Sequence, residues 1–152
     1  YFVSKGWELF YSNDDTTAMK RFNQAWLLDK SNPQIYWGFG NLLGKRKEFE
    51  ESIKYLKKSI DLDANNPKVY ECIAVSYGQM YFKTKDSKYL DLRIESLKKA
   101  MKIDSESGRV LGEIANTYAI LNQQDSLVKY IKKTDKIDSN FVNQKARASV
   151  KK

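Results

Sequence analysis

The side chains that could carry out chemistry are few, and their spacing matches no catalytic motif. The chain has no histidine, so the commonest general base and the commonest transition-metal ligand are both missing. Cys72 is the only cysteine, which leaves no cysteine-based zinc cluster and no disulfide framework. The glycines form no phosphate-binding loop of known spacing. The sequence therefore predicts a protein that is not an enzyme and that has no catalytic residue, metal site or cofactor.

The remaining reactive groups have structural explanations. The 19 Asp and Glu residues fall mainly at the expected ends of helices and on charged faces, where carboxylates cap helices and keep a surface hydrated. Cys72 stands among apolar residues, which is typical of a small packed side chain and not of a reactive thiol. The chemistry that the sequence supports is therefore binding.

The composition is that of a folded, helix-rich chain. Of the 152 residues, 41% are hydrophobic, while only two are proline and seven are glycine. This favours long regular helices. No apolar run reaches the roughly 18 residues that a membrane span requires. The chain begins at Tyr1 without a leader-like segment, so we expect a cut fragment or the mature part of an exported protein.

A string of eight residues occurs four times along the chain. It places a large apolar residue, a small residue three positions later, a second apolar residue after three more, and then Asp in every copy. This spacing describes one face of a helix, on which the small residue lets a neighbouring helix approach closely. Displacements of 34, 41 and 34 residues relate the copies, which are 22–29, 56–63, 97–104 and 131–138.

A second string recurs in phase with the first, and it also describes a helix face with one small contact residue. Its copies start near Phe2, Pro33, Pro67 and Gly108. Asn32 and Asn66 each precede a proline, as an N-cap precedes the first helical position, and Ser107 is the equivalent residue in the last copy. Each repeat therefore consists of a helix A, formed by this second string, and a helix B, formed by the first.

The period of 34 residues and the alternation of aromatic and small residues resemble the tetratricopeptide repeat. In the second copy these residues are Tyr36, Gly40, Leu43, Ser52, Leu56 and Ser59. The resemblance extends from about Phe2 to Asp138 and departs from the family pattern at Leu127, where a small residue is usual. It implies an all-α fold, a right-handed superhelical solenoid of antiparallel helix pairs. We expect a single domain over 1–152, with repeats at about 1–32, 33–66, 67–107 and 108–139 and a C-terminal capping helix at 140–152.

The repeats predict the helix boundaries. The expected A helices are 1–12, 33–45, 67–83 and 108–121, and the expected B helices are 16–29, 49–62, 88–103 and 126–138. The third repeat has extra residues, which predict a longer helix A and a longer turn, with Ser87 as the N-cap of its helix B. After the fourth repeat, Val142, Ala146 and Val150 recur every four residues among polar ones. They predict a ninth, amphipathic helix that closes the repeat array.

The resemblance implies that the A helices line a concave groove, so the residues of helix A outside the apolar string are the binding candidates. Four of them are aromatic: Trp7, Phe10, Tyr11 and Trp37. Exposed Trp and Tyr suit peptide recognition, because they give a large contact area for little lost entropy. The polar groups that would orient a partner are Asn41, Glu71, Arg109 and Asn116. The same aromatics could instead pack the end of the first repeat, and the sequence leaves both interpretations open.

The net charge of +8 suggests an alternative function. Two rows of lysines occupy equivalent positions of the B helices, one at Lys57, Lys98 and Lys132 and the other at Lys58, Lys99 and Lys133. Such a face could attract nucleic acid or another polyanion. However, lysine is also usual on hydrated helix faces, and no aromatic residues are interleaved with these lysines as they are in single-strand binding sites. Nucleic-acid binding is therefore disfavoured.

The sequence thus predicts a non-catalytic scaffold whose groove binds a protein or peptide segment. A further possibility is a structural segment of a longer repeat array. The strings at 18–29 and 36–40 resemble those of bacterial repeat proteins, many of them exported, which favours the bacterial cell envelope over the cytoplasm. The chemistry of the partner does not follow from a repeat scaffold, because specificity depends on a few groove side chains.

Overall fold

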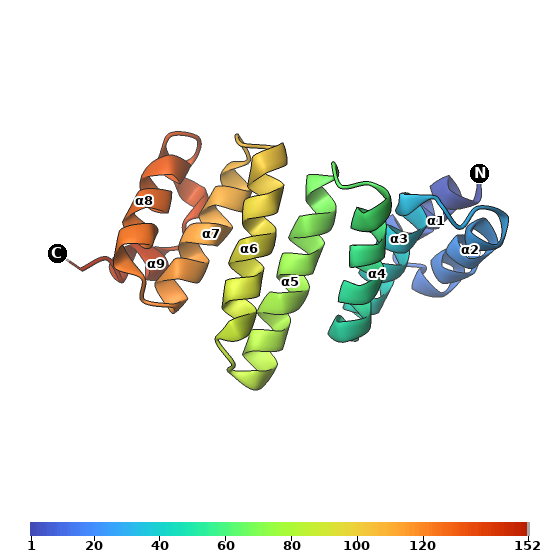
Figure 1. The fold of residues 1–152 in the computed structure, drawn as a ribbon, viewed down its shortest axis with the longest axis horizontal. Helices are drawn as coiled ribbons and strands as arrows, with labels where there is room; N and C mark the ends of the chain where they lie inside the picture. The colour runs from blue at the N-terminus through green and yellow to red at the C-terminus, as the bar shows by residue number, and fades with distance from the viewer. Residues whose placement is uncertain (152) are drawn as a thin grey trace. The chain divides into compact units, whose positions relative to one another are not determined.

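A computed structural model of the chain, which describes residues 1–151, places every described residue in a helix, a turn or a connecting segment (Figure 1). The helices are α1 (Phe2–Tyr11), α2 (Asp15–Leu28), α3 (Pro33–Lys45), α4 (Phe49–Leu62), α5 (Pro67–Thr84), α6 (Lys88–Ile103), α7 (Gly108–Ile120), α8 (Gln124–Asp135), the 3₁₀ turn η1 (Ser139–Phe141) and α9 (Gln144–Ala148). Short turns join successive helices, which run antiparallel. The prediction of an all-α fold built from antiparallel helix pairs is therefore confirmed.

The chain divides into two compact units, residues 1–76 and residues 77–152. The first unit contains α1 to α4 and the first part of α5, and the second contains the rest of α5 and all later helices. In the first unit, helix α2 packs against α1 and α3, and α3 packs against α4. In the second, α7 packs against α6 and α8. Within each unit, a helix A therefore packs against helix B of its own repeat and helix B of the repeat before.

The Asp that ends each repeated string forms a turn that follows helix B. In all four repeats, one of its carboxylate oxygens accepts the backbone N–H of the residue two positions later, a local bond typical of Asp in turns. The pairs are Asp29–Ser31 at 2.9 Å, Asp63–Asn65 at 2.9 Å, Asp104–Glu106 at 3.2 Å and Asp138–Asn140 at 2.9 Å. Asn32, Asn66 and Ser107 then cap the following A helices, as predicted, by accepting N–H groups of the first turn.

Phe22 of α2 lies at the centre of the core of the first unit. Its ring is fully buried and sits between Gly6 of α1 and Gly38 of α3. A Cβ atom added at Gly6 would stand 2.8 Å from Cε1 of this ring, and one added at Gly38 would overlap the ring. The two glycines therefore let a single aromatic ring join three helices, and they keep α1 and α3, both A helices, close to each other.

The core of the second unit is built from α6, α7 and α8. Leu127, which departs from the family pattern, is fully buried there. Thr117 and Thr134 are buried as well, but each hydroxyl donates to the backbone carbonyl four residues earlier, at 2.7 Å. Their burial therefore leaves no hydroxyl without a partner, which is the condition for a polar group inside a core.

The helices α1 to α7 begin and end within one residue of their predicted ranges, but the predicted cap of α6 is wrong. Ser87 stands at the N-cap position, and its side chain makes no capping bond. Its backbone is already helical, with φ −62° and ψ −19°, whereas a capping residue usually has extended geometry. Asp86 caps the helix instead and accepts the N–H of Lys88 at 3.0 Å.

The predicted C-terminal helix is also wrong in extent. Instead of one helix over 140–152, the chain forms η1 and then α9, which has only five residues. Helix α8 likewise ends at Asp135 and not at 138, since Asp138 forms the turn described above. The predicted apolar face is correct at Val142 and Ala146, which are buried. Residue 152 lies outside the described residues.

Candidate functional site

The four aromatic residues that the sequence proposes for the groove lie together in the first unit. Trp7 is at the centre of this aromatic cluster. Its ring centroid is 4.5 Å from that of Trp37, 5.5 Å from that of Phe10 and 5.9 Å from that of Tyr11. Helix α1 supplies three of the rings and α3 supplies the fourth. The cluster therefore joins the A helices of the first two repeats.

The aromatic cluster extends from the core to the solvent. Trp7 contacts the buried ring of Phe22 at a centroid distance of 5.4 Å. The Nε1 atoms of Trp7 and Trp37 are both buried, and neither has a hydrogen-bond partner among the described residues. Tyr11, in contrast, is 72% exposed. Trp7 thus packs the first repeat, and Tyr11 forms the edge of the cluster that faces solvent.

A pocket of ≈ 300 Å³ opens beside the cluster, between α3 and α5; we call it the α3–α5 pocket. Its walls include Phe10, Asn41, Lys45, Phe49, Cys72 and Val75. Val75 is 56% exposed, a large fraction for an apolar side chain. Apolar walls with a few polar groups are the usual composition of ligand-binding pockets.

Lys45 forms a polar wall of the α3–α5 pocket, and its charge is neutralised. Its Nζ lies 2.8 Å from Oδ1 of Asp15 and 3.1 Å from Oδ1 of Asn13. It also lies 4.3 Å from the centre of the Phe10 ring, where the negative face of the ring attracts a cation. This wall is therefore fixed in place and does not present an unpaired positive charge to the pocket.

Asn41 is the side chain of the α3–α5 pocket best able to take a new partner. Its Nδ2 donates to the backbone carbonyl of Trp37 at 2.9 Å, and its Oδ1 accepts from the thiol of Cys72 at 3.4 Å. A thiol is a weak donor, so a stronger donor from a ligand can replace it at Oδ1. Cys72 accordingly acts as a small packed residue beside Asn41, and the structure leaves it half-buried.

The second unit has a pocket at the equivalent place, between α5 and α7, with a volume of ≈ 240 Å³. The walls of this α5–α7 pocket include Phe82, Arg93, Glu113, Asn116, Ile120 and Asn143. A displacement of 41 residues, the one that separates the second and third copies of the repeated string, relates the α4 and α5 residues of the first pocket to five residues of the second. The pairs are Phe49 with Leu90, Ser52 with Arg93, Cys72 with Glu113, Val75 with Asn116 and Ser76 with Thr117. The pocket is therefore a recurring feature of the A helices.

Arg93 changes the chemistry of the second pocket. In the first pocket, the hydroxyl of Ser52 lies 3.3 Å from that of Ser76. In the second, Nε of Arg93 donates to Oγ1 of Thr117 at 3.1 Å, and its Nη2 forms an ion pair with Glu113. A neutral hydroxyl pair is thus replaced by a charged pair whose arginine side chain is 18% exposed and whose glutamate is 41% exposed.

The sequence did not point to Arg93 as a groove residue, because the groove was expected to be lined by the A helices alone. The repeat alignment contains the signal, since Ala18 and Ser52 hold the small position of helix B to which Arg93 corresponds. Of the eight proposed site residues, only Phe10, Asn41 and Asn116 line one of the two pockets. Trp7, Tyr11 and Trp37 belong to the aromatic cluster, whereas Glu71 and Arg109 line neither pocket and lie outside that cluster. Glu71 is half-buried and Arg109 is exposed.

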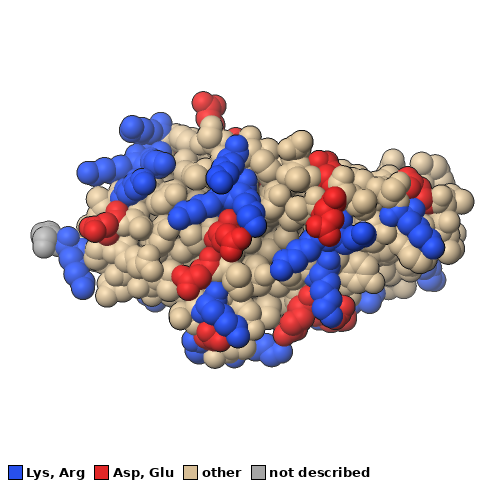
Figure 2. Space-filling model, viewed as in Figure 1, with Lys and Arg blue, Asp and Glu red and all other residues tan. Residues whose placement is uncertain are grey.

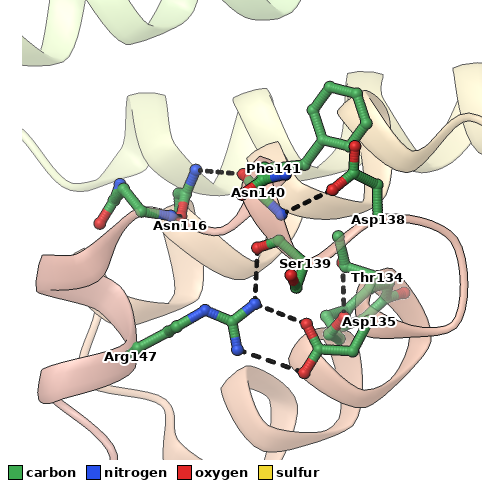
Figure 3. A network of polar contacts seen from close by, with 10 residues as sticks. Asn116, Thr134, Asp135, Asp138, Ser139, Asn140, Phe141 and Arg147 are labelled. Carbon is green, nitrogen blue, oxygen red and sulfur yellow. Dashed lines mark hydrogen bonds and ion pairs between the residues drawn. The ribbon is translucent and has the colours of Figure 1, made fainter.

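Asn116 lines the α5–α7 pocket, but the end of the chain already occupies its amide. Its Nδ2 donates to the backbone carbonyl of Phe141 at 3.3 Å (Figure 3). Its Oδ1 accepts the backbone N–H of Asn143 at 3.1 Å. Asn116, which corresponds to Val75 of the first pocket, therefore holds a segment of the chain itself.

The lysines of the B helices are in part absorbed by the fold. Basic and acidic side chains are intermixed over α6 in Figure 2, and Lys99 pairs with Glu95 at 2.9 Å. Lys98 lies 5.6 Å from the centre of the Tyr118 ring, and a hydrogen bond with Tyr118 raises the pKa of Lys98. These contacts favour a hydrated helix face over a dedicated polyanion site, although nearly all of the net charge falls in residues 77–152.

A larger hollow, of ≈ 460 Å³, is lined by residues of α2, α3 and α4 in the first unit. Trp26 and Tyr36 form its polar part, where Nε1 of Trp26 donates to the hydroxyl of Tyr36 at 3.2 Å. That hydroxyl in turn donates to the backbone carbonyl of Lys30 at 2.7 Å. The remaining walls, which include Met19, Phe39 and Tyr55, carry no charge. Asn23 adds a further polar group to this α2–α4 hollow.

Within residues 1–151, no three Cys, Asp or Glu side chains stand where they could hold a metal ion. No helix in the same range is long and apolar enough to cross a membrane.

Paired helices, a turn repeated at every helix B and a pocket repeated on the A helices define a helical-repeat protein. Residues 33–66 match the sequence model of the tetratricopeptide repeat. These residues form the second predicted repeat, with α3 and α4 as its two helices. The resemblance to that family is therefore confirmed over these residues.

Solved structures show the same fold. A crystal structure of MamA superposes with a TM-score of 0.80 at 20% identity and covers 91% of this chain and 77% of its own. MamA from Desulfovibrio magneticus RS-1 superposes with a TM-score of 0.75 at 15% identity and covers 91% of this chain and 75% of its own. A thermophilic tetratricopeptide protein of Thermus thermophilus superposes with a TM-score of 0.73 at 15% identity and covers 98% of this chain and 77% of its own. Comparison with curated protein sequences found no match.

Proposed function

We propose that the chain is a non-catalytic interaction module that binds a peptide or protein segment in the α3–α5 pocket. The observation that carries this proposal is the position of the pocket. It lies between two A helices, next to the aromatic cluster, and it recurs at the equivalent place in the second unit. A preformed pocket of this kind loses little entropy when a ligand binds.

The composition of the pocket favours a partner that inserts an apolar side chain. Phe10, Phe49 and Val75 supply apolar walls, and Lys45 offers no unpaired charge because Asp15 neutralises it. An acidic ligand would therefore gain little in this pocket. An apolar side chain would instead bury the exposed part of Val75, at a gain of roughly 25 cal/mol for each Å² of apolar surface removed from water.

Asn41 would supply the polar contact that orients the partner. Its Oδ1 is held only by the weak thiol bond of Cys72, so a backbone N–H of the partner can take its place. Tyr11, at the solvent-facing edge of the cluster, would add aromatic contact area outside the pocket. Trp7 and Trp37 would pack behind Tyr11 and would contact the partner less than Tyr11 does, because their indole nitrogens are buried.

Peptides selected from a random displayed library against the intact protein test this proposal. We expect selected peptides to share an apolar or aromatic residue and to bind with dissociation constants of about 1–100 µM, the range of small peptide interfaces. The variant Val75→Asp should weaken binding at least about tenfold, because it places a charge at the pocket.

Two matched variants introduce the same charge elsewhere in the first unit. Leu27→Asp alters an apolar side chain that is 71% exposed and lines neither the pocket nor the hollow, so binding should not change. Tyr55→Asp alters the α2–α4 hollow and should also leave binding intact. Loss of binding in Tyr55→Asp but not in Val75→Asp would move the site to that hollow and refute the proposal.

A further inference from the structure

Residues 139–143, which we call the C-terminal strap, depart from the repeat pattern at one position. Asp138 forms the same turn as the other three aspartates that end a helix B. The residue that would cap the next helix, 34 positions after Ser107, is Phe141. Phenylalanine cannot cap a helix, so the next helix starts only at Gln144, where Asn143 caps it with a 2.7 Å bond to the N–H of Ala146.

The strap begins with the 3₁₀ turn η1 and becomes extended at Val142 and Asn143. Val142 has φ −96° and ψ 120° and is 4% exposed, and Asn143 has φ −69° and ψ 156°. Phe141 lies over two glycines of α7, one turn apart. A Cβ atom at Gly108 would stand 2.9 Å from Cδ2 of Phe141, and one at Gly112 would stand 2.7 Å from its Cβ. The two glycines therefore form a shallow seat that admits the phenylalanine and its backbone.

Asn116, one turn beyond Gly112, binds the backbone of the strap. Its amide pairs with the carbonyl of Phe141 (Figure 3) and with the N–H of Asn143. Val142 lies between these two backbone groups in the chain. Main-chain hydrogen bonds of this kind give affinity for any extended segment, while the side chains between and beside them give specificity. Gly108, Gly112 and Asn116 thus make the contacts of a peptide site, with a segment of this chain as its occupant.

We propose that this α7 site binds extended partner segments in which an aromatic residue precedes a small apolar one, and that the strap blocks the site until it is displaced. This site is separate from the α3–α5 pocket and does not depend on the function proposed for that pocket. The strap competes with any partner as a tethered ligand, whose effective concentration for a short connection is in the millimolar range. The connection to α8 is short, since that helix ends at Asp135.

A contact outside the α7 site holds the strap in place. The guanidinium of Arg147 pairs with the carboxylate of Asp135 at 2.5 and 3.2 Å, and it donates to the backbone carbonyl of Ser139 at 2.7 Å (Figure 3). Asp135 belongs to α8 and Arg147 to α9. The strap can therefore be loosened at this contact and at Val142 without any change to the residues of α7.

The test uses the full chain and a fluorescein-labelled peptide with the sequence of residues 137–149. The double variant Val142→Asp/Arg147→Ala should release the strap, because it buries an unpaired charge and removes the ion pair. We expect fluorescence anisotropy to show binding of the peptide to this released variant at least about tenfold tighter than to the unchanged chain. A peptide that carries Phe141→Ala should lose that binding.

Substitutions in the site identify where the peptide binds. Gly112→Ala, added to the released variant, should weaken peptide binding at least about tenfold, because the atoms nearest to the added methyl all belong to Phe141. Gly44→Ala is the matched control, since its Cβ would meet only Oγ of Ser52 at 3.5 Å, and it should leave peptide binding unchanged. Equal binding by the released variant with and without Gly112→Ala would overturn the proposal.

Hydrogen exchange of the unchanged chain gives a second, independent measurement. If the strap is displaceable, the backbone amide of Asn143 should exchange at least about tenfold faster than the buried amides of α7, because local opening needs less free energy than global unfolding. Exchange of both at the same rate would mean that the strap opens only when the unit unfolds. That result, or loss of helical circular dichroism in the released variant, would also overturn the proposal.

Discussion

The ring centroids of Trp7 and Trp37 lie 4.5 Å apart, and the planes of the two rings meet at 53°. Trp7 comes from α1 and Trp37 from α3, so this contact joins the A helices of two repeats. Both indole N–H groups are buried without an acceptor, and a buried donor without a partner costs about 1–3 kcal/mol. The apolar contacts of the two rings therefore offset that cost, and we regard both residues as part of the packing.

Replacement of either tryptophan should accordingly destabilise the first unit. We expect Trp7→Ala and Trp37→Ala to lower the free energy of unfolding by about 3 kcal/mol each, the usual range for removal of a large aromatic from a packed site. Tyr11→Ala, at the exposed edge, should change it by less than about 0.5 kcal/mol. Urea unfolding with an unchanged m-value measures all three. A loss below about 1 kcal/mol for both tryptophans would show that they are surface residues.

The fold could be predicted from the sequence because every repeat carries the same local signals. Asp29 and its three counterparts form the turns that follow the B helices, and Asn32, Asn66 and Ser107 cap the A helices. The prediction failed at Ser87 and at the C-terminal helix for a common reason. Both places lie where the chain departs from the regular repeat, in the extra residues of the third repeat and after the fourth, and a neighbouring side chain, Asp86 or Asn143, caps the helix instead.

The candidate site was only partly predictable, because it depends on contacts between helices. The sequence places Phe10 and Asn41 on helix A, and both line the α3–α5 pocket. No periodicity could indicate that Trp7 also contacts Phe22, since that contact requires the close approach that Gly6 and Gly38 permit. Nor could the sequence show that the amide of Asn116 holds the strap, which lies on α7 only after the chain has turned back.

Four aspartates make the stability depend on acid pH. Their carboxylates accept hydrogen bonds that lower each pKa below its usual value of 3.8: Asp14 from Thr17, Asp29 from Ser31, Asp86 from Lys88 and Asp135 from Arg147. Because the folded pKa is lower, the unfolded chain binds protons first as the pH falls. The stabilisation is complete well above pH 3.8 and is lost as the pH falls through the folded pKa values.

We therefore expect the urea midpoint to stay level from about pH 7 to about pH 5.5 and to fall steadily below about pH 4. Asp29→Asn keeps an acceptor for Ser31 but cannot titrate, so the fall should be smaller in this variant. Asp61→Asn is the matched control, because Asp61 is an exposed aspartate on α4. The urea midpoint of this variant should fall as that of the unchanged chain does. An equal fall of the midpoint in all three proteins would contradict the assignment of the pH dependence to the turn at Asp29.

The last prediction concerns Arg93, whose guanidinium occupies space that Gly78 leaves open. A Cβ atom at Gly78 would overlap Nη1 of Arg93, which is held by Thr117 and Glu113 and cannot move aside freely. Gly44, the equivalent glycine of the first unit, faces only Oγ of Ser52, at 3.5 Å. Alanine is a better helix former than glycine by about 1 kcal/mol. Gly44→Ala should therefore stabilise the protein by up to that amount, and Gly78→Ala should destabilise it by about 1 kcal/mol.

The sign of the Gly78→Ala effect should reverse when Arg93 is replaced. The double variant Arg93→Ser/Glu113→Gln gives the second pocket the serine that the first pocket has at the equivalent position, and it leaves no buried charge. In this background, Gly78→Ala should stabilise the protein by about 0.5–1 kcal/mol. The ion pair itself should show a coupling energy of about 1 kcal/mol in a double-mutant cycle, because the glutamate is partly exposed. That coupling should shrink in about 1 M salt. Stabilisation by Gly78→Ala in the unchanged chain would show that Arg93 moves without cost and that the pocket is not fixed by this pair.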